Sequence, residues 1–101
     1  MPGSFETRFP ADHPTAAGHF PGNPIIPGAL LLDAVRHAIL GPKGDAECCE
    51  VRSVKFLHPV RPGDGLRIVW RELRDETHFE CTILETEKIA MTGSLCIGKR
   101  G

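Results

Sequence analysis

Residues 18–35 read GHFPGNPIIPGALLLDAV, and this stretch joins a loop to an apolar helix. Five of eight consecutive loop residues are proline or glycine: Pro21, Gly22, Pro24, Pro27 and Gly28. Because proline fixes φ and lacks an N–H, neither a helix nor a strand can run through such a loop, and its side chains are held in place. The stretch therefore holds two polar residues, His19 and Asp33, in position for either chemistry or packing.

The residues from Gly28 to Leu40 are predicted to form one helix, because they are mostly aliphatic and good helix formers. Pro27 suits the first turn, and Gly41 followed by proline is a clear stop. The first two turns are apolar on nearly every side, so we expect other structure to enclose them. Arg36 marks a face that reaches water near the end of the helix.

Period-two alternation of apolar residues predicts strands on both sides of this helix. The expected strands are a short edge strand at 4–10, then 49–60, 66–74, 77–85 and 88–97. In the last of them the alternation places Ile89, Met91, Leu95 and Ile97 on one face. One apolar face per strand is typical of an antiparallel sheet with one side covered, and the only available cover is the helix. The predicted fold class is therefore α+β, one long central helix wrapped by a curved antiparallel sheet of about five strands, in a single domain spanning 1–101.

Composition narrows the range of partners. The chain has 101 residues with a formal net charge of -1 and interspersed charges, which gives no basic face for nucleic acid. No apolar run is long enough for a membrane span and the first residues lack the layout of a secretory signal, so the expected compartment is the cytoplasm. A chain this short buries a smaller fraction of its surface than a longer chain does, which favours self-association. The four cysteines lack C-x-x-C spacing, and we interpret them as reduced thiols that pack as small apolar residues.

Asp33 stands among aliphatic residues, and two readings of it remain open. If the carboxylate is buried, it needs a partner or a proton. If it lies on the solvated stripe of the helix, Arg36 and His37 are near enough for a local ion pair.

The role of His19 is also left open by the residue alone. A lone histidine in a loop is more often a surface or capping residue than a catalyst. Its setting favours chemistry. The N–H groups of Gly28 and Ala29 should open the helix, where unpaired donors and the helix dipole stabilise developing negative charge. A base on a rigid loop, oxyanion donors and a carboxylate further along the helix are the parts that enolate chemistry needs.

The segment H-F-P-G-x-P-I-x-P-G, followed by aliphatic residues and a carboxylate fourteen residues after the histidine, resembles the signature of the 3-hydroxyacyl-(acyl carrier protein) dehydratases. The matching residues are His19, Phe20, Pro21, Gly22, Pro24, Ile25, Pro27, Gly28 and Asp33. A later segment with Val54-Lys55-Phe56, Pro59-Val60 and Pro62-Gly63-Asp64 is similar to the family's second recurrent stretch. The resemblance implies a hotdog fold, in which a long helix lies in a curled antiparallel sheet and two copies pair side by side as a homodimer.

The resemblance also implies an activity, the dehydration of a 3-hydroxyacyl thioester to the trans-2-enoyl thioester in fatty-acid or related acyl-chain synthesis. His19 would be the base, the Gly28 N–H would bind the thioester carbonyl, and Asp33 of the other subunit would protonate or orient the departing hydroxyl. The substrate tunnel would be lined by Phe20, Pro27, Ala29, Leu30 and His37. The acyl group would arrive on acyl carrier protein or coenzyme A, and no metal or organic cofactor is implied.

Two positions depart from the family pattern. Asp33 stands where simple dehydratases more often have glutamate, and aspartate is found in the branch that also isomerises the double bond. His37 replaces a common glutamine and could hydrogen-bond Asp33. Two other functions therefore stay open: a hotdog thioesterase, in which the helix-borne acid and the oxyanion donors activate water, and a non-catalytic acyl-binding protein that keeps the loop for packing.

Overall fold

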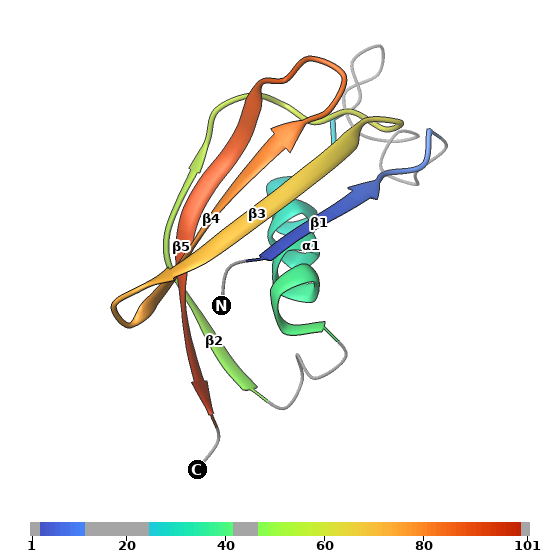
Figure 1. Cartoon of the computed structure of the whole chain (residues 1–101). Coiled ribbons are helices and arrows are strands. Elements are labelled where there is room, and N and C mark those ends of the chain that lie inside the picture. The colour runs from blue at the N-terminus through green and yellow to red at the C-terminus, as the bar shows by residue number, and fades with distance from the viewer. Residues whose placement is uncertain (1–2, 12–24, 42–46, 100–101) are drawn as a thin grey trace.

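The computed structural model describes residues 3–11, 25–41 and 47–99, which form one helix and five strands (Figure 1). The elements are β1 (Gly3–Arg8), α1 (Gly28–Leu40), β2 (Glu47–Phe56), β3 (Gly65–Leu73), β4 (Glu76–Ile83) and β5 (Ile89–Lys99). The predicted helix and all five predicted strands are present, so the predicted fold class is confirmed. Strand β2 ends at Phe56 rather than at the predicted position 60, because the backbone beyond it turns to hold the start of the helix: the carbonyl of Val60 accepts a 2.7 Å hydrogen bond from the Ile26 N–H.

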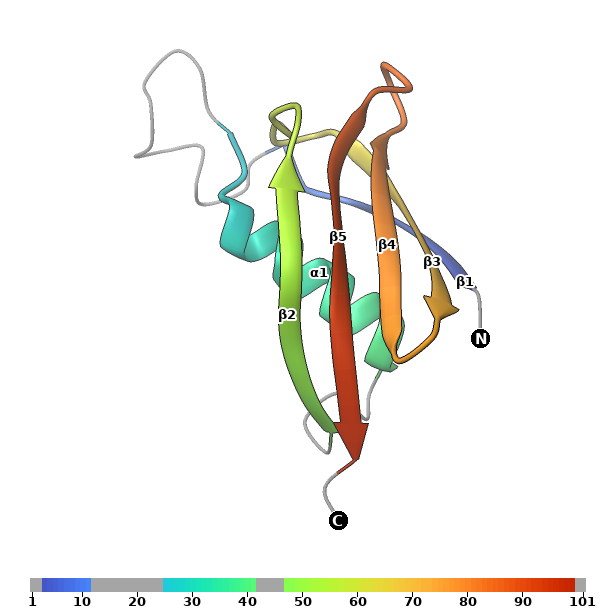
Figure 2. The same ribbon diagram turned by 90° about the vertical axis from the view of Figure 1, so that its left-hand side faces the viewer.

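The five strands form one antiparallel sheet in the order β1-β3-β4-β5-β2. Strand β1 is an edge strand, as its short length and the following proline predicted. Strand β2 forms the other edge. The sheet curves along one side of α1, and the helix crosses the concave face behind β2 and β5 (Figure 2). The sequence pattern anticipated this arrangement because one helix was the only cover for five half-apolar strands.

The core lies between α1 and the concave face of the sheet. The helix contributes Leu31 and Val35, which are almost fully buried. The sheet contributes alternate residues of its central strands: Leu66, Ile68, Phe79, Cys81, Ile83, Met91 and Leu95. The predicted alternation in β3 and β4 therefore selects the core correctly. Burial also raises the pKa of the Cys81 thiol to about 12, so this cysteine packs as an apolar residue, as expected.

One prediction about β5 was wrong. The pattern placed Ile89 on the apolar face with Met91, but the strand register shifts between Cys81 and Thr82, so that Cys81 opposes Met91 while Thr82 opposes Ile89. The extra residue is Ala90, which is fully buried in place of Ile89. A bulge of this kind reverses the alternation beyond it, which a strict period of two cannot anticipate.

Gly93 of β5 occupies a position with no room for a side chain. A Cβ atom there would collide with the carbonyl oxygen of Ser53 and would lie 2.7 Å from Cζ of Phe79. Because the obstacle is partly backbone, Gly93→Ala should lower the free energy of unfolding by about 1–3 kcal/mol. Thermal denaturation measures the effect. The control is Thr92→Ala, because Thr92 precedes Gly93 and lies on the opposite face of the strand. An unchanged unfolding midpoint for Gly93→Ala would contradict this packing.

A charged clamp ties the end of β1 to two turns of the sheet. Nη1 of Arg8 donates to the carbonyl of Gly63 at 2.6 Å and to Oε2 of Glu85 at 2.5 Å, while Oε1 of Glu85 accepts the Gly65 N–H at 2.9 Å. The hydrogen bond from Arg8, and then the one from Gly65, hold the pKa of Glu85 below its ordinary value.

The lowered pKa of Glu85 predicts that the folded protein loses stability as the pH falls. The folded state binds the Glu85 proton less readily than the unfolded state, so the contribution to stability is complete above the ordinary glutamate pKa of about 4.3 and is lost as the pH falls through the lower folded value. Glu85→Gln should therefore lower stability at neutral pH and show a smaller further loss on acidification than wild type. Unfolding measured from neutral to acidic pH, with exposed Glu80→Gln as control, tests this. Parallel curves for Glu85→Gln and wild type would exclude the effect.

Candidate active site

The start of α1 offers backbone N–H donors that no described residue accepts. Pro27 is the N-cap residue, with φ -59° and ψ 145°, and no side chain caps the helix. Its carbonyl accepts hydrogen bonds from the N–H groups of Leu30 and Leu31, at 3.0 and 3.3 Å. The N–H groups of Gly28 and Ala29 donate to no described residue. Because the helix dipole is positive at this end, the two donors favour an anion or a developing negative charge.

Gly28 also lies in close contact with Phe56 at the end of β2. The ring of Phe56 covers its Cα, so that a Cβ atom at position 28 would lie 2.6 Å from Cζ and 2.9 Å from Cε1 of Phe56. Only glycine fits without movement of the ring. Phe56 is nevertheless 51% exposed, so its other side is available for contact.

A cavity of about 360 Å³ opens at this helix start. Gly28 and Leu31 border it from the helix, Phe56 from the end of β2, and His58 and Val60 from the segment that follows. The lining is mostly apolar with a few polar groups, and the volume lies within the range usual for small-molecule sites. The cavity can therefore take an apolar group whose polar end reaches the N–H of Gly28.

Asp33 does not face this cavity. Leu31 both borders the cavity and packs in the core, whereas Asp33, two residues later, lies about 160° away around the helix. The carboxylate is exposed, on a stripe shared with Ala29, Arg36 and His37. The expectation that other structure encloses the first two turns is wrong for a single chain, because the sheet covers only one side of α1. Among the described residues, Asp33 also forms no ion pair with Arg36 or His37.

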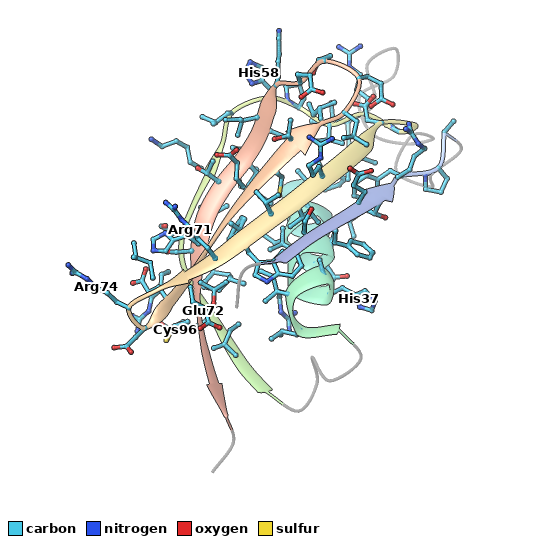
Figure 3. All side chains as sticks on the ribbon, in the orientation of Figure 1. His37, His58, Arg71, Glu72, Arg74 and Cys96 are labelled. Carbon is cyan, nitrogen blue, oxygen red and sulfur yellow. The ribbon has the colours of Figure 1, made fainter. Side chains whose placement is uncertain are left out.

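The other residues predicted for the site lie at different depths. Pro27 and Ala29 flank Gly28, and Leu30 is half-buried against the core. His37 points away from the sheet near the far end of the helix (Figure 3), about 13 Å along the axis from Gly28, so it does not meet the cavity of its own chain. His19 and Phe20 lie outside the described residues.

Of the residues that line the cavity, only Gly28 was among those predicted for the site, and the residues missed include Phe56 and His58. Phe56 belongs to the second recurrent stretch, so its motif could have marked it, but its contact with Gly28 depends on the strand register. His58 lies at the end of the sheet where β2 stops (Figure 3), and its Nδ1 is 3.0 Å from the carbonyl oxygen of Ile89. Since a carbonyl only accepts, Nδ1 carries the proton in this contact.

Two other kinds of site were searched for in the part of the chain that the structure describes. No group of three or more histidine, cysteine or carboxylate side chains could hold a metal ion there. None of the described helical residues forms a helix long and apolar enough to cross a membrane.

The architecture, a curved antiparallel sheet around one long helix that starts at an apolar cavity, is that of the hotdog proteins. The family model for ApeI-like dehydratases, described as ApeI dehydratase, matches residues 3–94. The chain belongs to this family.

Curated and solved relatives agree with this assignment. A 3-hydroxyacyl-(acyl-carrier-protein) dehydratase FabZ of Levilactobacillus brevis is 33% identical over 89 residues, covering 77% of this chain and 60% of that protein. The FabZ of Thermomicrobium roseum is 40% identical over 65 residues, covering 56% and 44%. In the solved dehydratase heterocomplex ApeI:P from Xenorhabdus doucetiae, a chain superposes with a TM-score of 0.79 at 20% identity, over 97% of this chain and 88% of that one. The likeness to this solved structure shows the hotdog fold. The chain spans about half the length of the curated relatives it matches.

Proposed function

We propose that this protein dehydrates 3-hydroxyacyl thioesters to trans-2-enoyl thioesters. The observation that carries the proposal is the start of α1, where Gly28, whose N–H donates to no described residue, borders a mostly apolar cavity together with Phe56. A thioester carbonyl bound there would receive the hydrogen bond that stabilises an enolate, and the acyl chain would lie against apolar side chains. Membership of a dehydratase family supports the same reaction.

The reaction divides among three groups. His19 takes the proton from the carbon next to the thioester carbonyl, and the electron pair of that C–H bond moves toward the carbonyl oxygen at the Gly28 N–H. The pair then forms the carbon–carbon double bond while the bond to the 3-hydroxyl breaks. Asp33 delivers a proton to the departing hydroxyl, which leaves as water. The α-proton is left on His19 and the proton of the departing water comes from Asp33, so a proton passing from His19 to Asp33 through solvent restores both groups, and the steps need no cofactor.

The acid that serves each cavity comes from a second copy of the chain. In one chain Asp33 lies on the side of α1 opposite Leu31, so its own cavity is out of its reach. The exposed stripe with Asp33 would be covered in a homodimer, which also accounts for the aliphatic character of the first helical turns. The proposed site is therefore shared, with His19 and Gly28 from one copy and Asp33 from the other.

The names of the curated relatives suggest acyl carrier protein as the substrate carrier, and coenzyme A offers the same pantetheine thioester. Since both carriers present the acyl group on one kind of arm, the reaction at the cavity is the same for either. We place the protein in the cytoplasm, in fatty-acid or related acyl-chain synthesis.

One assay tests this function. The protein is incubated with 3-hydroxyacyl and enoyl thioesters of several chain lengths, on carrier protein and on coenzyme A, and conjugated enoyl product and free thiol are followed together. Interconversion of hydroxyacyl and enoyl thioesters without free thiol is the expected result. Free thiol without enoyl product would instead identify a thioesterase. Acyl binding with neither product would identify a non-catalytic protein.

A further inference from the structure

His58 is the one residue with a polar side chain among the described residues that line the cavity at the helix start. The others are glycine, proline, phenylalanine and aliphatic residues. An apolar group in the cavity therefore contacts most of its lining, but a ligand finds a hydrogen-bonding side chain only at position 58. In small-molecule sites a few polar groups of this kind fix the orientation of the ligand and give specificity.

The cavity runs from a buried floor to an exposed rim. Ile26, Leu31 and Val60 are at most 3% exposed and form the floor, whereas Leu57 is 45% exposed and His58 is also exposed. Apolar atoms of a ligand are stabilised at the floor, because burial removes them from water. A polar part of the same ligand stays at the rim, where water and His58 satisfy its hydrogen bonds.

The start of β5 holds the imidazole of His58 at the end of the sheet (Figure 3). Its Nδ1 donates to the carbonyl of Ile89 at 3.0 Å, and the backbone N–H of His58 donates to the carbonyl of Ala90 at 3.3 Å. Pro59, the next residue, restricts the backbone of His58 to extended conformations. Because ring and backbone are fixed before a ligand arrives, a hydrogen bond to Nε2 costs little side-chain entropy.

Nε2 of His58 matches an amide group in either protonation state of the ring. In the neutral ring with its proton on Nδ1, Nε2 accepts a hydrogen bond, which an amide N–H donates. In the charged ring Nε2 donates, and an amide carbonyl accepts. An ester or a phosphate supplies acceptors alone, whereas a secondary amide supplies both partners. Among neutral polar groups, an amide is therefore well suited to this position.

Amides are also the polar groups that follow the thioester in both candidate carriers. The pantetheine arm of acyl carrier protein and of coenzyme A contains secondary amides, and a short ethylene unit separates the first of them from the thioester sulfur. With the thioester carbonyl at the Gly28 N–H and the acyl chain on the apolar floor, the arm leaves the cavity across its rim. His58 is the described hydrogen-bonding side chain at that rim.

We propose that His58 binds an amide of the pantetheine arm and thereby selects thioesters carried on that arm. The proposal rests on the proposed dehydratase function, to which it adds a residue that recognises the carrier rather than the acyl chain. His58 takes no part in the proton transfers. Its loss should therefore weaken substrate binding and leave the chemical step unchanged.

Two substitutions separate the roles of the two ring nitrogens. In His58→Asn the side-chain amide takes the place of Nδ1 and keeps the hydrogen bond to Ile89, but nothing replaces Nε2. In His58→Gln the longer side chain reaches the position of Nε2 and gives up the bond to Ile89. With a 3-hydroxyacyl-coenzyme A substrate, His58→Asn should raise KM about three- to tenfold at unchanged kcat, as expected for the loss of one hydrogen bond. His58→Gln should recover most of this loss.

A series of thioesters identifies the amide as the partner. The same acyl group is presented on coenzyme A, on N-acetylcysteamine, which keeps only the first amide of the arm, and on ethanethiol, which has none. His58→Asn should raise KM for carriers with an amide and leave kcat/KM for the ethyl thioester unchanged. An effect on coenzyme A alone would place the contact at the second amide. The matched control is His78→Asn, a histidine of β4 outside the cavity lining, which should behave as wild type with every carrier.

The outcomes separate the arm contact from the dehydratase function. An unchanged KM for the coenzyme A thioester in His58→Asn, an equal rise for the ethyl thioester, or no recovery in a His58→Gln protein that thermal unfolding shows to be folded would overturn the contact. Binding of a saturated acyl-coenzyme A is measured in parallel by calorimetry. Tighter binding by wild type than by His58→Asn, without enoyl formation, would retain the contact and remove the dehydratase function. Enoyl formation that does not depend on His58 would do the reverse.

Discussion

A mixture of His19→Ala and Asp33→Asn chains should form enoyl product that neither variant forms alone. Each substitution removes one proton-transfer group and should lower the turnover rate by about 10²–10⁴-fold. In a mixed dimer one site combines both lesions, while the other combines intact His19 from one chain with intact Asp33 from the other. After dissociation and reassociation of equal amounts, half of the dimers are mixed, so about a quarter of wild-type activity should return.

The physical reason is the position of Asp33 on the side of α1 away from the cavity that Leu31 borders. Complementation is measured by the formation of conjugated enoyl thioester, and thermal unfolding checks that both variants fold. The control is a chain that carries both substitutions: mixed with either single variant it leaves no site with both groups intact, so it should restore no activity. A mixture as inactive as its parents would show that Asp33 does not act across subunits. Wild-type turnover in either single variant would remove that residue from the mechanism.

Gly28→Ala should reduce both activity and stability. The new Cβ atom would lie 2.6 Å from Cζ of Phe56, so the helix start or the ring must move. Overpacking of a closed core costs about 1–3 kcal/mol, and because the half-exposed ring of Phe56 can partly move aside, the loss here should lie near the lower end of that range. Displacing one oxyanion donor should lower the turnover rate by about 10²–10³-fold.

A second substitution separates the two effects. Phe56→Leu removes the ring atoms that meet the new Cβ, so the stability loss from Gly28→Ala should be smaller in the Phe56→Leu background. Chemical denaturation of the four proteins in a double-mutant cycle gives the coupling between positions 28 and 56. Additive losses would show that the ring does not limit position 28, and undiminished turnover in Gly28→Ala would show that the N–H at this position does not bind the carbonyl.

The fold was largely predictable because its signals are local. The helix from Gly28 to Leu40 was anticipated to the residue, since Pro27 and Gly41 mark its ends. The strands followed from period-two alternation, and β1 was recognised as an edge strand from its length and the proline after it. Alternation failed at Ala90, where a bulge inserted one residue and moved Ile89 off the buried face.

The site was less predictable because it depends on distances between segments far apart in the chain. Helical periodicity left Asp33 open between a buried and a solvated position, and the packing of Leu31 and Val35 against the sheet resolved this for a single chain. Gly28 was expected to open the helix and does so. No local pattern could place the ring of Phe56 over Gly28, since that contact requires the register of β2 as well as the angle at which α1 crosses the sheet.

By itself the sequence determined the rigid loop-to-helix stretch, the family signature within it and the elements of the sheet, because backbone restriction by proline and glycine and the spacing of apolar residues act over a few residues. The tertiary structure alone decided which side of the helix the sheet covers, where the bulge at Ala90 shifts the alternation of β5, and which side chains close the cavity at Gly28. These features depend on strand order and register, which arise from burial summed over the whole chain.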